Sequence, residues 1–67
     1  MLSDHDRALL ERIYPLALAA AGELDSPRNR TIAANDLWLF AQAGGGSEAE
    51  AIEALVRGLR SCERRPD

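Results

Sequence analysis

Apolar residues recur three and four positions apart in two stretches of the chain, which is the spacing of one face of an α-helix. Near the N-terminus this face consists of Leu9, Leu10, Ile13, Leu16, Ala17, Ala20 and Leu24, with Tyr14 at its margin. Towards the C-terminus it consists of Ile52, Leu55, Val56 and Leu59. The sequence lacks the period-two alternation of a strand and has few β-branched residues, so the pattern predicts an all-α fold.

Capping residues divide the chain into three predicted helices, at about 4-22, 27-43 and 48-62. Ser3 can cap the first helix, and Ser26 can cap the second, whose first position is a well-tolerated Pro27. Ser47 followed by Glu50 is a capping-box pattern and opens the third helix. The sequence therefore predicts a three-helix bundle.

Three local features modify this bundle. Pro15 lies inside the first helix, where it removes a backbone hydrogen bond, and we expect a kink there; a break into two short helices is the alternative. Three glycines end the second helix and, with the serine that follows, should form a flexible joint at 44-47. Residues 1-67 are expected to be one small domain with a frayed tail at 63-67.

The second predicted helix contains four consecutive large apolar side chains, from Leu37 to Phe40. Each residue turns by about 100° from the last, so these side chains point to every side of the helix. A helix that is apolar all round is usually buried from more than one direction. Either this helix is engulfed by its own bundle, or another protein chain covers part of it.

Polar residues split the apolar surface of this helix into two arcs. The broader arc (Ala33, Ala34, Leu37, Trp38, Phe40, Ala41) suits packing on the other helices, and the narrower arc (Ile32, Leu39, Ala43) suits a second surface. Asp36 falls between them, and we expect it to set the register of an interface by pairing with an arginine across it. The alternative is an exposed acid at the edge of the bundle. The predicted partner-binding residues are Ile32, Asp36, Trp38, Leu39 and Phe40.

The size of the chain also favours association. A core built from 67 residues is marginal, and small domains usually gain stability from disulfides, metals or oligomerisation. Cys62 is the single cysteine, which excludes an internal disulfide. We therefore expect a homodimer or a complex with a larger protein.

The formal net charge of −3 argues against a general nucleic-acid binder, because such proteins usually present a basic surface. Arg28 and Arg30 at the start of the second helix could hold an anion; the alternative is ion pairing with Asp25 or Glu23. Further arginines lie along one side of the third helix, at Arg57, Arg60 and Arg64. A small DNA-associated regulator that uses these arginine clusters in a dimer is therefore the alternative function.

Candidate chemistry is scarce. His5 is the only histidine, it lies far from Cys62 in the sequence, and the two have no metal-ligand spacing. We expect no enzymatic activity, metal or cofactor. The lone thiol and the acidic residues around His5 favour a cytoplasmic protein, and no uncharged stretch is long enough to span a membrane.

We accordingly expect a small protein–protein interaction module that self-associates through the second helix. It could also act as an inhibitor, adaptor or regulatory subunit of a larger protein. A smooth stripe of Ala51, Ala54 and Gly58 on the third helix could be a second contact face, but alanine is also simply a good helix former.

Overall fold

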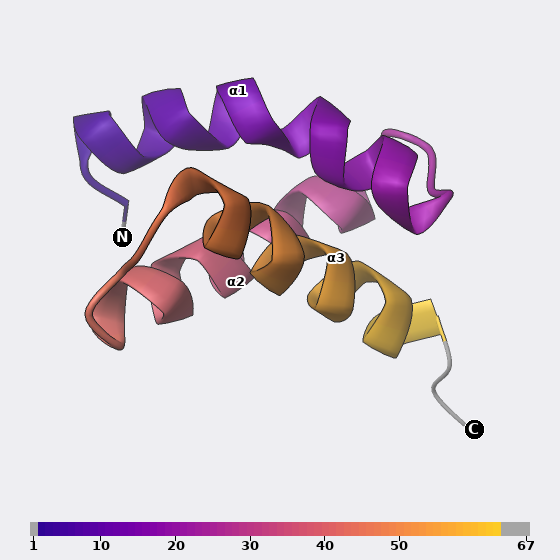
Figure 1. Cartoon of the computed structure of the whole chain (residues 1–67). Coiled ribbons are helices and arrows are strands. Elements are labelled where there is room, and N and C mark those ends of the chain that lie inside the picture. Colours follow the sequence, from indigo (N-terminus) through magenta and orange to yellow (C-terminus); the bar gives the residue numbers. More distant parts are fainter. Residues whose placement is uncertain (1, 64–67) are drawn as a thin grey trace.

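The computed structural model describes the backbone of residues 2–63 and the side chains of residues 2–60. It contains three helices, α1 (Asp4–Ala21), α2 (Pro27–Gln42) and α3 (Glu48–Glu63), and all three pack against one another (Figure 1). The predicted all-α three-helix bundle is therefore confirmed, and each helix ends within one residue of its predicted end. The predicted frayed tail falls largely outside the described residues.

Side-chain caps fix where the first two helices begin. The Ser3 hydroxyl accepts a hydrogen bond from the Asp6 N–H at 3.1 Å, and the Ser26 hydroxyl accepts one from the Asn29 N–H at 3.1 Å. Each serine thereby satisfies a backbone donor that a helix start leaves without a partner. The two caps predicted from the sequence are present.

The turn between α2 and α3 combines two glycines in positive-φ conformations with a complete capping box. Gly44 and Gly45 have φ values of 110° and 72°, which residues with a side chain rarely adopt. The Ser47 N–H donates to a Glu50 carboxylate oxygen at 2.9 Å, and the Glu50 N–H donates to the Ser47 hydroxyl at 3.1 Å. These residues reverse the chain, so that α3 packs against both other helices.

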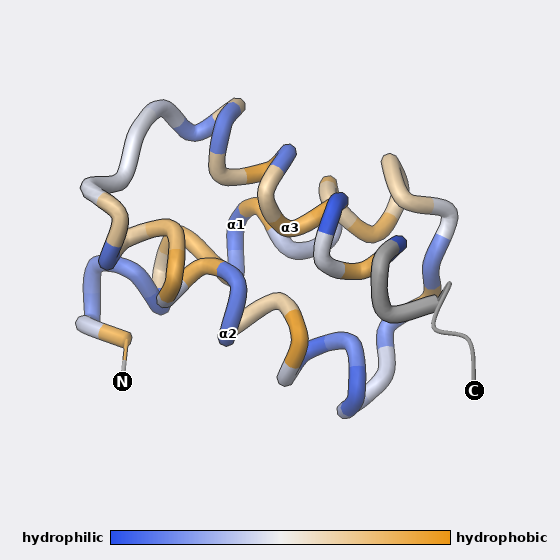
Figure 2. Tube along the Cα trace, turned by 90° about the horizontal axis from the view of Figure 1, so that it is seen from below, coloured by the Kyte–Doolittle hydropathy of each residue, from blue (hydrophilic) through white to orange (hydrophobic). Residues whose placement is uncertain are grey.

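The core is narrow and draws on one stripe of each helix. Hydrophobic and hydrophilic segments alternate along the tube in Figure 2, as amphipathic helices require. In α2 the buried side chains are Ala33 and Leu37, both in the arc predicted to face the bundle. The complete set of buried side chains is Ile13, Ala17, Leu18, Ala33, Leu37, Ala51, Leu55 and Leu59.

The predicted core face of α1 is wrong in part. Leu16 and Leu24 are 52% and 84% exposed, and Ala20 is also exposed, whereas Leu18 is only 8% exposed. The buried face is rotated towards Tyr14, whose hydroxyl donates to an Asp25 carboxylate oxygen at 2.8 Å. Leu24 follows the end of the helix, so helical spacing does not apply to it.

Pro15 does not break the first helix. It lies inside α1 and is exposed, so the carbonyl that it leaves without a helical hydrogen bond can face water. Figure 1 shows α1 as one uninterrupted, arched ribbon. The prediction of one helix rather than two is confirmed.

Candidate partner-binding groove

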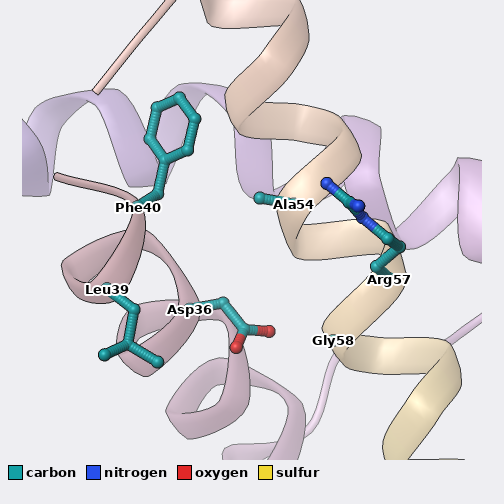
Figure 3. A pocket seen from close by; sticks show the side chains of 6 residues that line it. All are labelled: Asp36, Leu39, Phe40, Ala54, Arg57 and Gly58. Carbon is teal, nitrogen blue, oxygen red and sulfur yellow. The ribbon is translucent and has the colours of Figure 1, made fainter. Parts of the chain in front are cut away.

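A shallow groove of about 410 Å³ lies between α2 and α3 and is open to solvent. Helical spacing explains its composition, because residues three and four positions apart lie on one face. Positions 36, 39 and 40 of α2 form one wall, and positions 54, 57 and 58 of α3 form the other (Figure 3). The lining residues are Asp36, Leu39, Phe40, Ala54, Arg57 and Gly58.

The groove combines a protruding side chain with a hollow. Leu39 is 51% exposed and points away from α3, while Phe40 is half-buried and packs against the core (Figure 3). On the opposite wall Ala54 leaves room because its side chain is only a methyl group, whereas the space over Gly58 is taken up by the Asp36 carboxylate. A large apolar side chain is therefore uncovered beside a space that nothing large fills.

Asp36 occupies a position that only a glycine on α3 permits. A methyl group added at Gly58 would overlap the Asp36 carboxylate, Oδ2 above all. Glycine inside a helix costs about 1 kcal/mol relative to alanine. The absence of a side chain at this position thus allows the carboxylate to lie against α3.

One oxygen of the Asp36 carboxylate is shielded from water. Its Oδ2 atom is buried and has no hydrogen-bond partner among the described residues. This burial raises the pKa of the Asp36 carboxyl above its ordinary value, because a charge loses hydration there. Arg57 lies on the facing wall, but no ion pair joins these two side chains in the described structure.

The five predicted partner-binding residues do not form one surface. Asp36, Leu39 and Phe40 meet in the groove, whereas Ile32 is half-buried and packs against the core. Trp38 is 36% exposed and lies on the other flank of α2. There it borders an open hollow of about 700 Å³, together with Leu2, Arg7, Thr31, Ala34 and Asn35.

Arg30 of the predicted anion site is bound within the chain. Its Nε and Nη2 atoms donate to Oδ1 and Oδ2 of Asp25, each at 2.9 Å, while Tyr14 donates to the same carboxylate. These hydrogen bonds lower the pKa of Asp25 and raise that of Arg30. The ion pair expected as the alternative to anion binding is present, and it joins the α1–α2 loop to α2. The anion site itself stays a prediction, and Arg28 is exposed.

The α3 wall of the groove was not among the predicted partner-binding residues. Ala54 and Gly58 belong to the small-residue stripe, and Arg57 to the arginine side of the predicted third helix. A glycine inside an otherwise alanine-rich helix was the available signal, because it lowers helix stability without an evident local reason. The sequence does not reveal that its counterpart is Asp36.

The described residues offer no other recognisable chemistry. They contain no group of three histidine, cysteine, aspartate or glutamate side chains able to hold a metal ion. None of the described helices combines the length and apolar character of a membrane span.

Comparison with protein-family models, curated proteins and solved structures gives no match.

We expect Asp36→Asn to stabilise the monomer by about 1 kcal/mol near neutral pH, because it removes a desolvated charge. A raised pKa in the folded state means that wild-type stability decreases as pH rises through that pKa. The advantage of Asp36→Asn should therefore vanish on acidification below the ordinary aspartate pKa. Urea denaturation at low protein concentration, across a pH series, measures both effects.

Asp25→Asn is the matched control for this pH dependence. The pKa of Asp25 is lowered in the fold, so its contribution to stability is present at neutral pH and is lost as pH falls. Asp25→Asn should destabilise the protein at neutral pH, the opposite sign to Asp36→Asn. Two variants with the same sign at neutral pH would contradict this assignment of the two carboxylates.

Gly58→Ala should reveal the contact with Asp36 in a double-mutant cycle. In an Asp36→Ala background the added methyl group has room, and better helix propensity should stabilise the protein by about 1 kcal/mol. In the wild type the same change must displace the carboxylate, so the gain should disappear. Equal effects of Gly58→Ala in both backgrounds, measured by chemical denaturation, would show that the two side chains do not interact.

Proposed function

We propose that this chain is a protein–protein interaction module without enzymatic activity and that its partner at the groove is a second copy of itself. The observation that carries this proposal is the pairing of a half-exposed Leu39 with a hollow in the same groove beside Ala54. Side chains that insert into spaces on a facing helix are the usual packing unit of helical interfaces. Each copy has both halves of such a contact.

A second copy fits the groove because the groove is self-complementary. In a two-fold symmetric dimer the same patch meets itself, and every contact occurs twice. A suitable patch must therefore contain a protrusion and a hollow, and opposite charges rather than one sign. This groove has Leu39 and the small-residue hollow, and it has Asp36 and Arg57.

The area that a dimer requires is compatible with the size of the chain. A small specific interface buries at least about 1,200 Å² in total, or about 600 Å² from each partner. That amounts to roughly one eighth of the 4707 Å² accessible surface of the chain. Such a patch would have to extend from the groove over the neighbouring faces of α2 and α3, and it could leave the Trp38 flank uncovered. The dimer would then retain a second apolar surface on each copy for a larger protein that it could inhibit, link or regulate.

DNA binding has less support than protein binding. One of the two arginines at the start of α2, Arg30, already makes a bidentate ion pair with Asp25. Contact with a phosphate would require that this pair be broken or shared. The net charge of −3 also disfavours approach to a polyanion.

Leu39→Asp should dissociate the proposed dimer, because it would leave a charge in an apolar contact. Sedimentation equilibrium over a concentration series, under reducing conditions that prevent disulfides at Cys62, should give twice the monomer mass for the wild type and the monomer mass for Leu39→Asp. The wild-type dimer should persist in high salt, because apolar burial does not weaken there.

Leu16→Asp is the matched control. Leu16 is 52% exposed, about as much as Leu39, but it lies on α1 and does not line the groove. The Leu16→Asp protein should remain dimeric, and circular dichroism should show that both variants keep their helices. A wild-type protein that is monomeric at every concentration would overturn the proposal, as would equal dissociation by the two variants.

A further inference from the structure

We infer that two reciprocal ion pairs determine how the groove recognises its partner, with Asp36 of each copy bound to Arg57 of the other. This inference rests on the proposed self-association and adds the specificity of the contact to it. The two side chains lie on opposite walls of one groove, Asp36 on α2 and Arg57 on α3 (Figure 3). A two-fold axis along the groove would bring each wall opposite its complement on the second copy.

Among the described residues, neither side chain has a partner of opposite charge. Asp36 Oδ2 is buried and lacks a hydrogen-bond donor among the described residues. Arg57 is exposed, and within the described structure it forms no ion pair with Asp36 or with Glu53, one helical turn earlier. Figure 3 shows the guanidinium beside Ala54, whereas the Asp36 carboxylate points towards Gly58. An acceptor without a donor and a donor without an acceptor thus border the same surface.

Pairing across the interface would compensate a cost that the monomer already bears. Asp36 has lost part of its hydration on folding, so a guanidinium that approaches it gains more than one that approaches a fully hydrated carboxylate. Arginine suits this role because its charge attracts the carboxylate as a whole and its several N–H groups can donate to the carboxylate from the open side of the groove, while the buried Oδ2 stays against α3. The glycine at position 58 leaves the space that the carboxylate occupies, since any side chain there would displace it.

Reciprocity gives this inference a sharp test by charge reversal. Asp36→Arg places an arginine opposite Arg57 twice in its own dimer, and Arg57→Asp places two aspartates together twice. Each variant alone should dimerise at least about tenfold more weakly than the wild type, because like charges meet at two places. An equimolar mixture of the two variants brings opposite charges together at both places, so it should form a heterodimer with about the wild-type affinity.

A chain that carries both substitutions tests whether the two positions can exchange their charges. Asp36→Arg with Arg57→Asp should dimerise with itself but not with the wild type, since every mixed contact joins like charges. Arg60→Asp is the control for the single variant Arg57→Asp, because it makes the same change of net charge on an exposed residue of α3 that does not line the groove. Its dimer affinity should match that of the wild type. Sedimentation equilibrium measures each affinity, and native mass spectrometry identifies the composition of each mixed dimer.

The outcomes separate this inference from the self-association on which it rests. If Leu39→Asp dissociates the dimer but the mixed variants do not recover affinity, the dimer stands and the reciprocal pairs are overturned. Charge-reversed variants that dimerise as tightly as the wild type overturn the pairs as well. A wild-type protein that is monomeric at every concentration would overturn both the self-association and the ion pairs.

A second set of variants covers the case in which an arginine at position 36 disturbs the fold. Asp36→Asn and Arg57→Gln each remove one member of the pair without adding bulk. If the two side chains pair, the double variant should lose no more affinity than either single variant. Additive losses would overturn the inference.

Discussion

The narrow core constrains everything else in this structure. One stripe of α3, with Ala51, Leu55 and Leu59, packs against both other helices, and the remaining buried side chains fill the space around it. A core of this width can cover only one side of α2, which it does through Ala33 and Leu37. Leu39 and part of Trp38 remain outside because none of the three described helices covers them. The exposed apolar surface of α2 follows from geometry and not from an excess of hydrophobic residues.

At the contact between Asp36 and Gly58, local stability is given up on both helices. A glycine weakens α3, and a carboxylate in partial burial weakens the monomer, yet each makes sense only in the presence of the other. In most natural sequences the helix propensity and the polarity of each residue agree with its place in the fold, and residues that depart from this agreement are often functional. The contact between Asp36 and Gly58 is such a departure, and the proposed dimer would account for it by giving Asp36 a partner on the second copy.

The helix bounds could be predicted from the sequence, but which face of each helix is buried could be predicted only in part. Ser3, Ser26 and the Ser47–Glu50 box act through local hydrogen bonds, so their positions fix the helix starts without knowledge of the tertiary fold. The spacing does not fix the buried face of α1, because leucines and alanines surround much of that helix, and Leu18 lies in the core where Leu16 was predicted. The groove required long-range information: Asp36 was recognised as unusual, but nothing local connects it to Gly58 on another helix.

The most direct test of the account is a search for contacts between copies in a sample that mixes isotope-labelled and unlabelled chains. Intermolecular nuclear Overhauser effects should connect the Leu39 methyl groups of one copy to the Ala54 methyl group of the other, because the proposal inserts Leu39 into the hollow beside Ala54. An association whose intermolecular contacts involve the Trp38 indole, and not Leu39 and Ala54, would contradict the groove as the interface. A sample that shows no intermolecular contact at concentrations up to the millimolar range would contradict self-association itself.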